Sequence, residues 1–136
     1  MTHRFLISLL LLCGCHVQLA LAEPFSAEQL VRLDRVGGPA VSPDGSQVVY
    51  TLRKTDMDAG KGRYDLWLTA MDGAAARPLT THAANDTGAA WSPDGRFVYF
   101  ISSRSGSSQV WRIALDGGEA TQVTDLPLDV GSYRLS

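Results

Sequence analysis

The tetrapeptide Ser-Pro-Asp-Gly occurs twice in this sequence, at residues 42–45 and 92–95. It suits a type I turn, because proline presets φ at the second position, aspartate tolerates the third and glycine accepts a positive φ at the fourth. A run of β-branched and aromatic residues follows each copy, at 48–52 and 97–101, and such runs favour strands. Each copy therefore predicts a tight turn between two antiparallel strands.

A second turn signal follows each of these hairpins, the Asp-Gly pair at residues 72–73 and again at 116–117. The unit then contains strand, tight turn, strand, loop, strand, tight turn and strand. Trp67 and Trp111 are 44 residues apart in the two copies. A four-stranded unit that recurs at about 40–45 residues is typical of a β-propeller blade. The sequence therefore predicts an all-β fold built from propeller blades.

The repeat predicts a domain organisation for the chain. We expect one four-stranded blade over residues 39–80, a second over 88–124, and the start of a third over 130–136. The segment 82–87 is small and polar, as a linker between blades should be. Two blades cannot close a ring, since each sheet must bury its faces against neighbours. We therefore expect the chain to be an N-terminal fragment of a longer protein.

The first 22 residues have the pattern of a secretory signal. Arg4 supplies a positive start, residues 5–12 are apolar, and Ala20-Leu21-Ala22 fits the small-residue cleavage site. The apolar run is too short to span a membrane. An alternative is the segment 12–15, which resembles a bacterial lipobox and would make Cys15 a lipidated N-terminus. Either interpretation predicts an exported protein, periplasmic or extracellular.

Both cysteines, Cys13 and Cys15, lie within this signal. If cleavage follows Ala22, the mature part of the chain has no disulfide and no cysteine-based metal site, although export would allow disulfides. The formal net charge is −2. That near-neutral balance implies no nucleic-acid partner and no anionic membrane surface.

A short helix is predicted between the signal and the first blade, over residues 23–36. Ser26 is a suitable N-cap, and Gln29 three residues later completes a capping box. The glycine pair 37–38 should end the helix. We expect residues 23–38 to form a helical clasp that packs on the propeller.

Several side chains could carry chemistry, and each has a structural alternative. The aspartates of the turns could be metal ligands, but aspartate in such turns usually binds its own backbone. The tryptophans could form a stacking platform, but two of them recur at equivalent strand positions, which indicates core. His82 stands in the linker and is expected to be solvated. Arg104 lies in a polar loop and could bind a carboxylate. The three tryptophans are Trp67, Trp91 and Trp111.

We expect no catalytic, cofactor-binding or metal-binding residues in this chain. There is no Gly-x-Ser-x-Gly elbow and no histidine paired with a suitable serine and aspartate. Gly60-Lys61-Gly62 lacks the upstream glycine and the following hydroxyl residue of a phosphate-binding loop. Asn85-Asp86-Thr87 is a formal glycosylation sequon.

The chain resembles the N-terminal propeller of the prolyl oligopeptidase family of serine peptidases, in its dipeptidyl-peptidase V and acylaminoacyl-peptidase types. The similar segments are the opening Phe25-Ser26-Ala27-Glu28-Gln29-Leu30, the two Ser-Pro-Asp-Gly turns, and residues 110–118. The resemblance covers residues 23–136. TolB-type propellers share the blade motif, but a helix that leads directly into the first blade fits the peptidases better.

The resemblance implies an exported serine exopeptidase that cleaves short peptides. Its propeller would restrict access to a C-terminal α/β-hydrolase domain, expected beyond residue 136, that carries a Ser-Asp-His triad. The chain itself would not be catalytic. The alternative is a non-enzymatic, TolB-like periplasmic propeller that binds a protein or a glycan.

Overall fold

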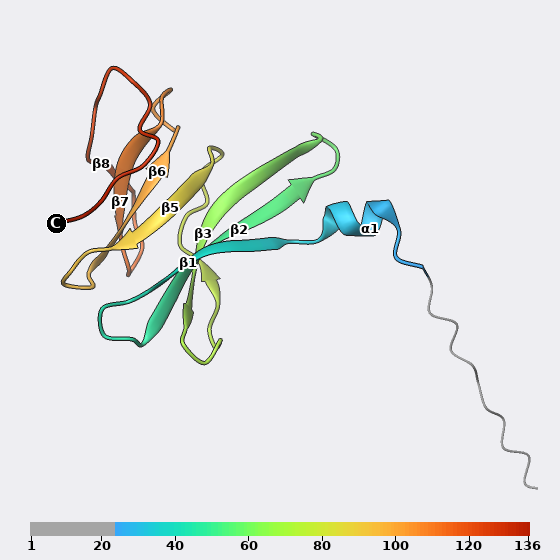
Figure 1. The fold of residues 1–136 in the computed structure, drawn as a ribbon, viewed down its shortest axis with the longest axis horizontal. Helices are drawn as coiled ribbons and strands as arrows, with labels where there is room; N and C mark the ends of the chain where they lie inside the picture. The colour runs from blue at the N-terminus through green and yellow to red at the C-terminus, as the bar shows by residue number, and fades with distance from the viewer. Residues whose placement is uncertain (1–23) are drawn as a thin grey trace, which may run out of the picture.

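The computed structural model describes residues 24–136, so the predicted secretory signal and both cysteines lie outside the described residues. One short helix precedes eight strands, which form two four-stranded antiparallel sheets with their strands in sequence order. The two sheets lie side by side like neighbouring blades (Figure 1). The elements are α1 (Ala27–Arg32), β1 (Arg35–Val41), β2 (Gln47–Asp56), β3 (Lys61–Ala70), β4 (Arg77–Pro78), β5 (Asp86–Trp91), β6 (Phe97–Ser102), β7 (Gln109–Ala114) and β8 (Thr121–Gln122).

The predicted pair of four-stranded blades is confirmed. In each sheet a Ser-Pro-Asp-Gly turn joins the first two strands, and the Asp-Gly turn joins the last two. Trp67 and Trp111 occupy equivalent positions on the third strands, since Trp67 pairs with Tyr50 and Trp111 with Phe100. Residues 130–136 carry no strand of their own.

The fourth strands are short because each ends in the same local hydrogen-bond pattern. Leu79 N and Thr80 N both donate to Leu66 O, and the Thr80 hydroxyl accepts from Leu66 N at 3.0 Å. In the second sheet Val123 N and Thr124 N both donate to Val110 O, and the Thr124 hydroxyl accepts from Val110 N at 2.9 Å. The 44-residue repeat therefore reproduces individual hydrogen bonds as well as strands.

The N-terminal segment differs from the prediction. The capping box is confirmed, since Ser26 Oγ accepts from Gln29 N at 3.1 Å and Gln29 Oε1 accepts from Ser26 N at 2.8 Å. The helix nevertheless ends at Arg32, and none of its residues is buried. It extends away from the sheets (Figure 1). The helix is thus shorter than the expected 23–36 and, among the described elements, touches only β2, and the packing of a clasp over 23–38 on a propeller stays a prediction.

The glycine pair 37–38 lies inside strand β1 instead of ending the helix. The pairing of β1 with β2 shifts between Gly37 and Ala40, and that of β5 with β6 shifts at the equivalent place, between Thr87 and Ala90. Gly38 and Gly88 have φ values of 55° and 65°. A bulge at this position needs a left-handed residue, which glycine adopts without strain. The sheets consequently begin earlier than the expected residues 39 and 88.

The turn aspartates bind the local chain, as the sequence predicts. The carboxylate of Asp44 accepts from the Ser42 hydroxyl at 2.6 Å and from Ser46 N at 3.0 Å. Asp94 accepts in the same way from the Ser92 hydroxyl at 2.6 Å and from Arg96 N. The serine hydroxyls, followed by these backbone N–H groups, lower the pKa of both carboxyls to about 2.

The core lies between the two sheets. Val98 and Phe100 of β6 and Ile113 of β7 pack in one buried cluster with residues of the first sheet. Phe100 and Val98 are fully buried. Trp91 adds a polar contact to this interface, because its indole N–H donates to Ala40 O of β1 at 2.9 Å. The first-sheet members of the cluster are Val49, Leu66, Leu68 and Leu79.

Each sheet also has an outer face that points away from the other sheet, because side chains alternate along a strand. Tyr50 and Trp67 lie on the outer face of the first sheet, at the positions that Phe100 and Trp111 occupy in the second. Trp111 packs against the core cluster, but Trp67 does not. Trp111 and Trp91 therefore contribute to the core of the described residues, whereas Trp67 lies on the open face of the first sheet, and its place in a core between blades stays a prediction.

The tail of the chain contacts the second sheet. The Tyr133 hydroxyl donates to Gly88 O of β5 at 2.8 Å, and Val130 N donates to Ser108 O at 2.7 Å. Burial raises the pKa of Tyr133 to about 12. The residues expected to begin a third blade thus lie against the first strand of the second blade.

The two tryptophans provide a matched stability test within residues 24–136. Trp111→Ala removes a side chain packed on the core cluster, and we expect it to lower the free energy of unfolding by about 3 kcal/mol. Trp67→Ala should lower the free energy of unfolding by less than half as much, because the Trp67 side chain lies on the outer face of the first sheet. Chemical denaturation at low protein concentration measures both. Equal losses would mean that the two faces are buried alike.

The turn aspartates predict a loss of stability in acid. Because their pKa in the folded chain, about 2, is lower than the ordinary value of 3.8 for an aspartate, the folded state favours the ionised carboxyl, and this stabilisation disappears as the pH falls from about 4 through about 2. Asp94→Asn should flatten this part of the curve of midpoint against pH. The exposed Asp116→Asn, in the other type of turn, is the control. An unchanged acid limb in Asp94→Asn would contradict the assignment.

Candidate functional site

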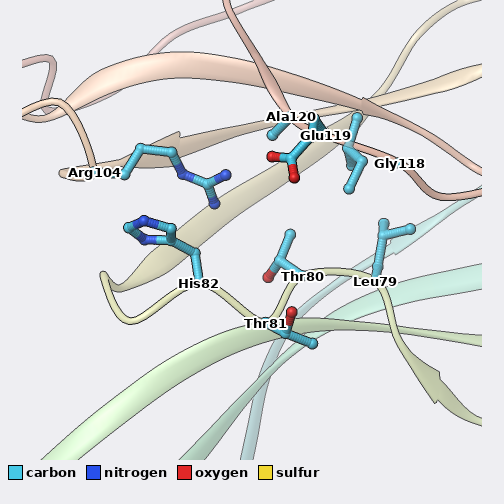
Figure 2. Close-up of a pocket in the computed structure, with 9 residues that line it drawn as sticks. Leu79, Thr80, Thr81, His82, Arg104, Gly118, Glu119 and Ala120 are labelled. Carbon is cyan, nitrogen blue, oxygen red and sulfur yellow. The ribbon is translucent and has the colours of Figure 1, made fainter.

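A polar pocket of about 280 Å³ lies on the seam between the two sheets. Its walls come from the segment that follows β4, from the loop before β8 and from the loop after β6. Figure 2 shows side chains from these segments directed toward a common space. The lining residues are Leu79, Thr80, Thr81, His82, Arg104, Ile113, Gly118, Glu119 and Ala120.

Arg104 is the most constrained side chain of the pocket. Its Nη2 donates to both carboxylate oxygens of Asp86, at 2.9 and 2.8 Å, and its Nε donates to the Ser102 hydroxyl at 3.0 Å. The Arg104 side chain is 11% exposed and that of Asp86 is fully buried. A buried carboxylate requires such a partner, because removing an unpaired charge from water is costly. Arg104, for which the sequence left open a polar loop residue or a carboxylate-binding one, therefore binds a carboxylate of the chain itself.

Two aromatic rings support the guanidinium. Its central carbon lies 5.1 Å from the ring centroids of both Phe100 and Trp111, within the range of cation–π attraction. The first sheet has a related arrangement, with Lys54 Nζ 4.9 Å from the Trp67 ring. The repeat therefore keeps a cation near the third-strand tryptophan, and in the second sheet this cation also binds a buried carboxylate directly.

The remaining polar side chains of the pocket are more accessible. His82 is exposed, and its Nδ1 accepts from Ala84 N at 3.0 Å. Its Nε2 is then the nitrogen that carries the proton in the neutral ring. Glu119 is exposed, and its carboxylate faces Arg104 across the pocket in Figure 2. The four ion pairs of the described residues do not include Glu119.

A second buried carboxylate lies outside this pocket. Asp65 of β3 accepts from Arg63 Nε at 3.0 Å through one oxygen, and its other oxygen has no partner among the described residues. Burial raises the pKa of Asp65, and the attraction of Arg63 offsets this only in part. Asp65 stands at the repeat position of Gln109, whose amide binds the segment after β8 through Leu126 and Leu128.

The sequence singled out two members of the pocket, His82 and Arg104, but it did not predict that they share one. It missed Asp86, which was assigned to the linker and is in fact the first, buried residue of β5. The repeat gave no signal for this pair, because Val36 and Lys54 hold the equivalent positions in the first blade. The cross-strand pairing of Asp86 with Ser102 was needed to place Asp86 beside Arg104.

Asn85, the asparagine of the glycosylation sequon, has a structural role. The Asn85 side-chain oxygen accepts from Tyr64 N at 3.1 Å, which ties the linker to β3. Among residues 24–136 no three His, Cys, Asp or Glu side chains gather where a metal ion could bind. Across the same residues no helix is long and apolar enough to cross a membrane.

The seam pocket offers the nitrogen donors of Arg104 and His82 on one side and the carboxylate of Glu119 on the other.

Comparison with curated proteins finds peptidases. The chain is 28% identical over 119 residues to dipeptidyl-peptidase 5 of Porphyromonas endodontalis, an alignment that covers 88% of this chain and 17% of that protein. The chain spans less than a fifth of the length of the curated peptidases it matches. The resemblance to the propeller part of this peptidase family is thereby confirmed.

Comparison with solved structures finds the same blades. A protein described as a TolB from Agrobacterium tumefaciens is 31% identical, with a TM-score of 0.53, over 69% of this chain and 31% of that one. An acylaminoacyl peptidase of Pyrococcus horikoshii shares the fold at 18% identity, with a TM-score of 0.57, over 71% of this chain and 15% of that one. The sequence model of the TolB beta propeller domain matches residues 28–129, and the chain therefore belongs to the TolB β-propeller domain family.

Proposed function

We propose that this chain is part of the propeller of an exported serine exopeptidase of the dipeptidyl-peptidase or acylaminoacyl-peptidase type. The observation that carries the proposal is the alignment with dipeptidyl-peptidase 5, which runs over 88% of the chain and therefore includes the helix-to-blade opening or the tail in addition to the blades. The two four-stranded antiparallel sheets fit a segment of a propeller.

In this proposal the propeller limits which substrates reach a catalytic domain encoded beyond residue 136. That domain would be an α/β-hydrolase with a Ser-Asp-His triad, in which serine attacks the scissile carbonyl and histidine acts first as base and then as acid. The propeller would admit short peptides and exclude folded proteins. The signal-like residues 1–22 support export to the periplasm or the extracellular space.

A second candidate function is a non-enzymatic propeller that binds a protein or a glycan. The 31% identity to the TolB-type structure favours it, because that protein shares the blades over 69% of this chain. The two candidates differ in one property, the presence of a reactive serine in the protein that contains this chain.

Activity of the whole protein tests the first candidate. It should release dipeptides or acylated residues from the N-termini of short peptides, and a serine-directed phosphonylating reagent should abolish this release and label one serine. A whole protein that takes up no reagent and cleaves no peptide would favour the binding propeller.

The described part alone should behave differently from the whole protein. Residues 24–136 should show no peptidase activity, and they should self-associate, because both sheets expose an outer face with aromatic residues. Sedimentation velocity should show that Tyr50→Glu, on the outer face of the first sheet, reduces this association. Met71→Glu, in an exposed turn, is the control. Peptidase activity that copurifies with residues 24–136 would contradict the proposal.

A further inference from the structure

The seam pocket contains hydrogen-bond donors on one wall that the fold leaves unused. The hydrogen bonds of Arg104 within residues 24–136 involve Nε and Nη2, and none involves Nη1. The guanidinium points into the pocket (Figure 2). His82 supplies a second donor, because its Nδ1 is occupied by Ala84 N and its Nε2 carries the proton of the neutral ring. This wall is suited to a carboxylate.

The opposite wall is suited to a cation. The Glu119 carboxylate faces this space, and it belongs to none of the ion pairs of the described residues. Arg104 and Asp86 already neutralise each other, so Glu119 contributes a net negative charge. An ammonium group placed here would gain a charge-assisted hydrogen bond.

We propose that the seam pocket binds a free α-amino acid as its zwitterion. The α-carboxylate accepts from Arg104 Nη1 and His82 Nε2, and the α-ammonium donates to Glu119. The two charged groups of the guest are attached to one carbon, and the two walls of opposite character face each other across one small pocket. Asp86 acts as a positioning residue, because both of its carboxylate oxygens accept from Nη2 and, together with the Nε contact to the Ser102 hydroxyl, hold the guanidinium in place.

The size and the apolar lining of the pocket limit which amino acids can bind. Its volume of about 280 Å³ is just below the range of sites for drug-sized ligands, so it suits a guest of few heavy atoms. Leu79 and Ile113 line it and are almost fully buried. An apolar side chain would lie against these two residues, and leucine is the probe that we choose. This inference does not rest on the proposed peptidase function.

Titration calorimetry of the whole protein with leucine tests the proposal. We expect a Kd on the order of 1 mM, since the site is open and small. Two half-molecules, analogues of leucine with one charged group each, test the two walls separately. The analogue 4-methylpentanoate has only the carboxylate, and 3-methylbutylamine has only the ammonium. Each should bind at least about ten times more weakly than leucine, because each satisfies one wall.

Matched variants locate the site. Glu119→Gln keeps the shape and removes the charge, and we expect it to weaken leucine binding about tenfold without weakening the binding of 4-methylpentanoate, which has no ammonium group. Asp116→Asn removes the same charge three residues away, outside the pocket lining, and should bind leucine as the unmodified protein does. Both side chains are exposed, so neither variant should change the thermal midpoint.

Three results would overturn the proposal. The first is no binding of leucine at 50-fold above the expected Kd. The second is equal affinity for leucine and for either half-molecule, which would show a simple ion site. The third is leucine binding that is the same in Glu119→Gln and the unmodified protein. Because the readout is binding and not peptide cleavage, each result stands apart from the outcome of the peptidase assay.

Discussion

The apolar contact between the two sheets is the interaction on which the rest of this structure depends. An isolated hairpin or a single small sheet is at best marginally stable in water, because it cannot bury enough apolar surface. Here Val98, Phe100 and Ile113 bury the inner face of the second sheet against the first. The same packing brings the segment after β4 close to the loop after β6, so it also creates the seam pocket.

This contact is directional, which has consequences for assembly. The inner face of the second sheet matches, by the repeat, the outer face of the first sheet. Each outer face could therefore pack against a further sheet in the way that the two inner faces pack against each other, as in a head-to-tail arrangement. Head-to-tail contacts give a closed ring where the rotation from one copy to the next allows it. The outer position of Trp67 and the inner position of Trp111 follow from this polarity, although the two residues are equivalent in the repeat.

Function in a repeat protein has to come from the places where the copies differ. The Asp86–Arg104 pair is such a place, since the first blade has Val36 and Lys54 at these positions. A buried ion pair adds little net stability compared with apolar residues of the same size. What it adds here is a guanidinium of fixed orientation beside a polar pocket. That constraint carries the proposed amino-acid site, whereas the blades themselves carry only the architecture.

The sequence by itself determined the local structure: the two Ser-Pro-Asp-Gly turns, the order of strands, the spacing of the repeat and the Ser26 capping box. These depend on φ preferences and on hydrogen bonds between residues a few positions apart, which short motifs encode directly. Only the tertiary structure decided that Gly38 forms a bulge, that the helix buries none of its residues, and that Asp86 lies beside Arg104. Those outcomes depend on cross-strand register and on which face meets which sheet, and both are set by contacts between residues distant in the chain.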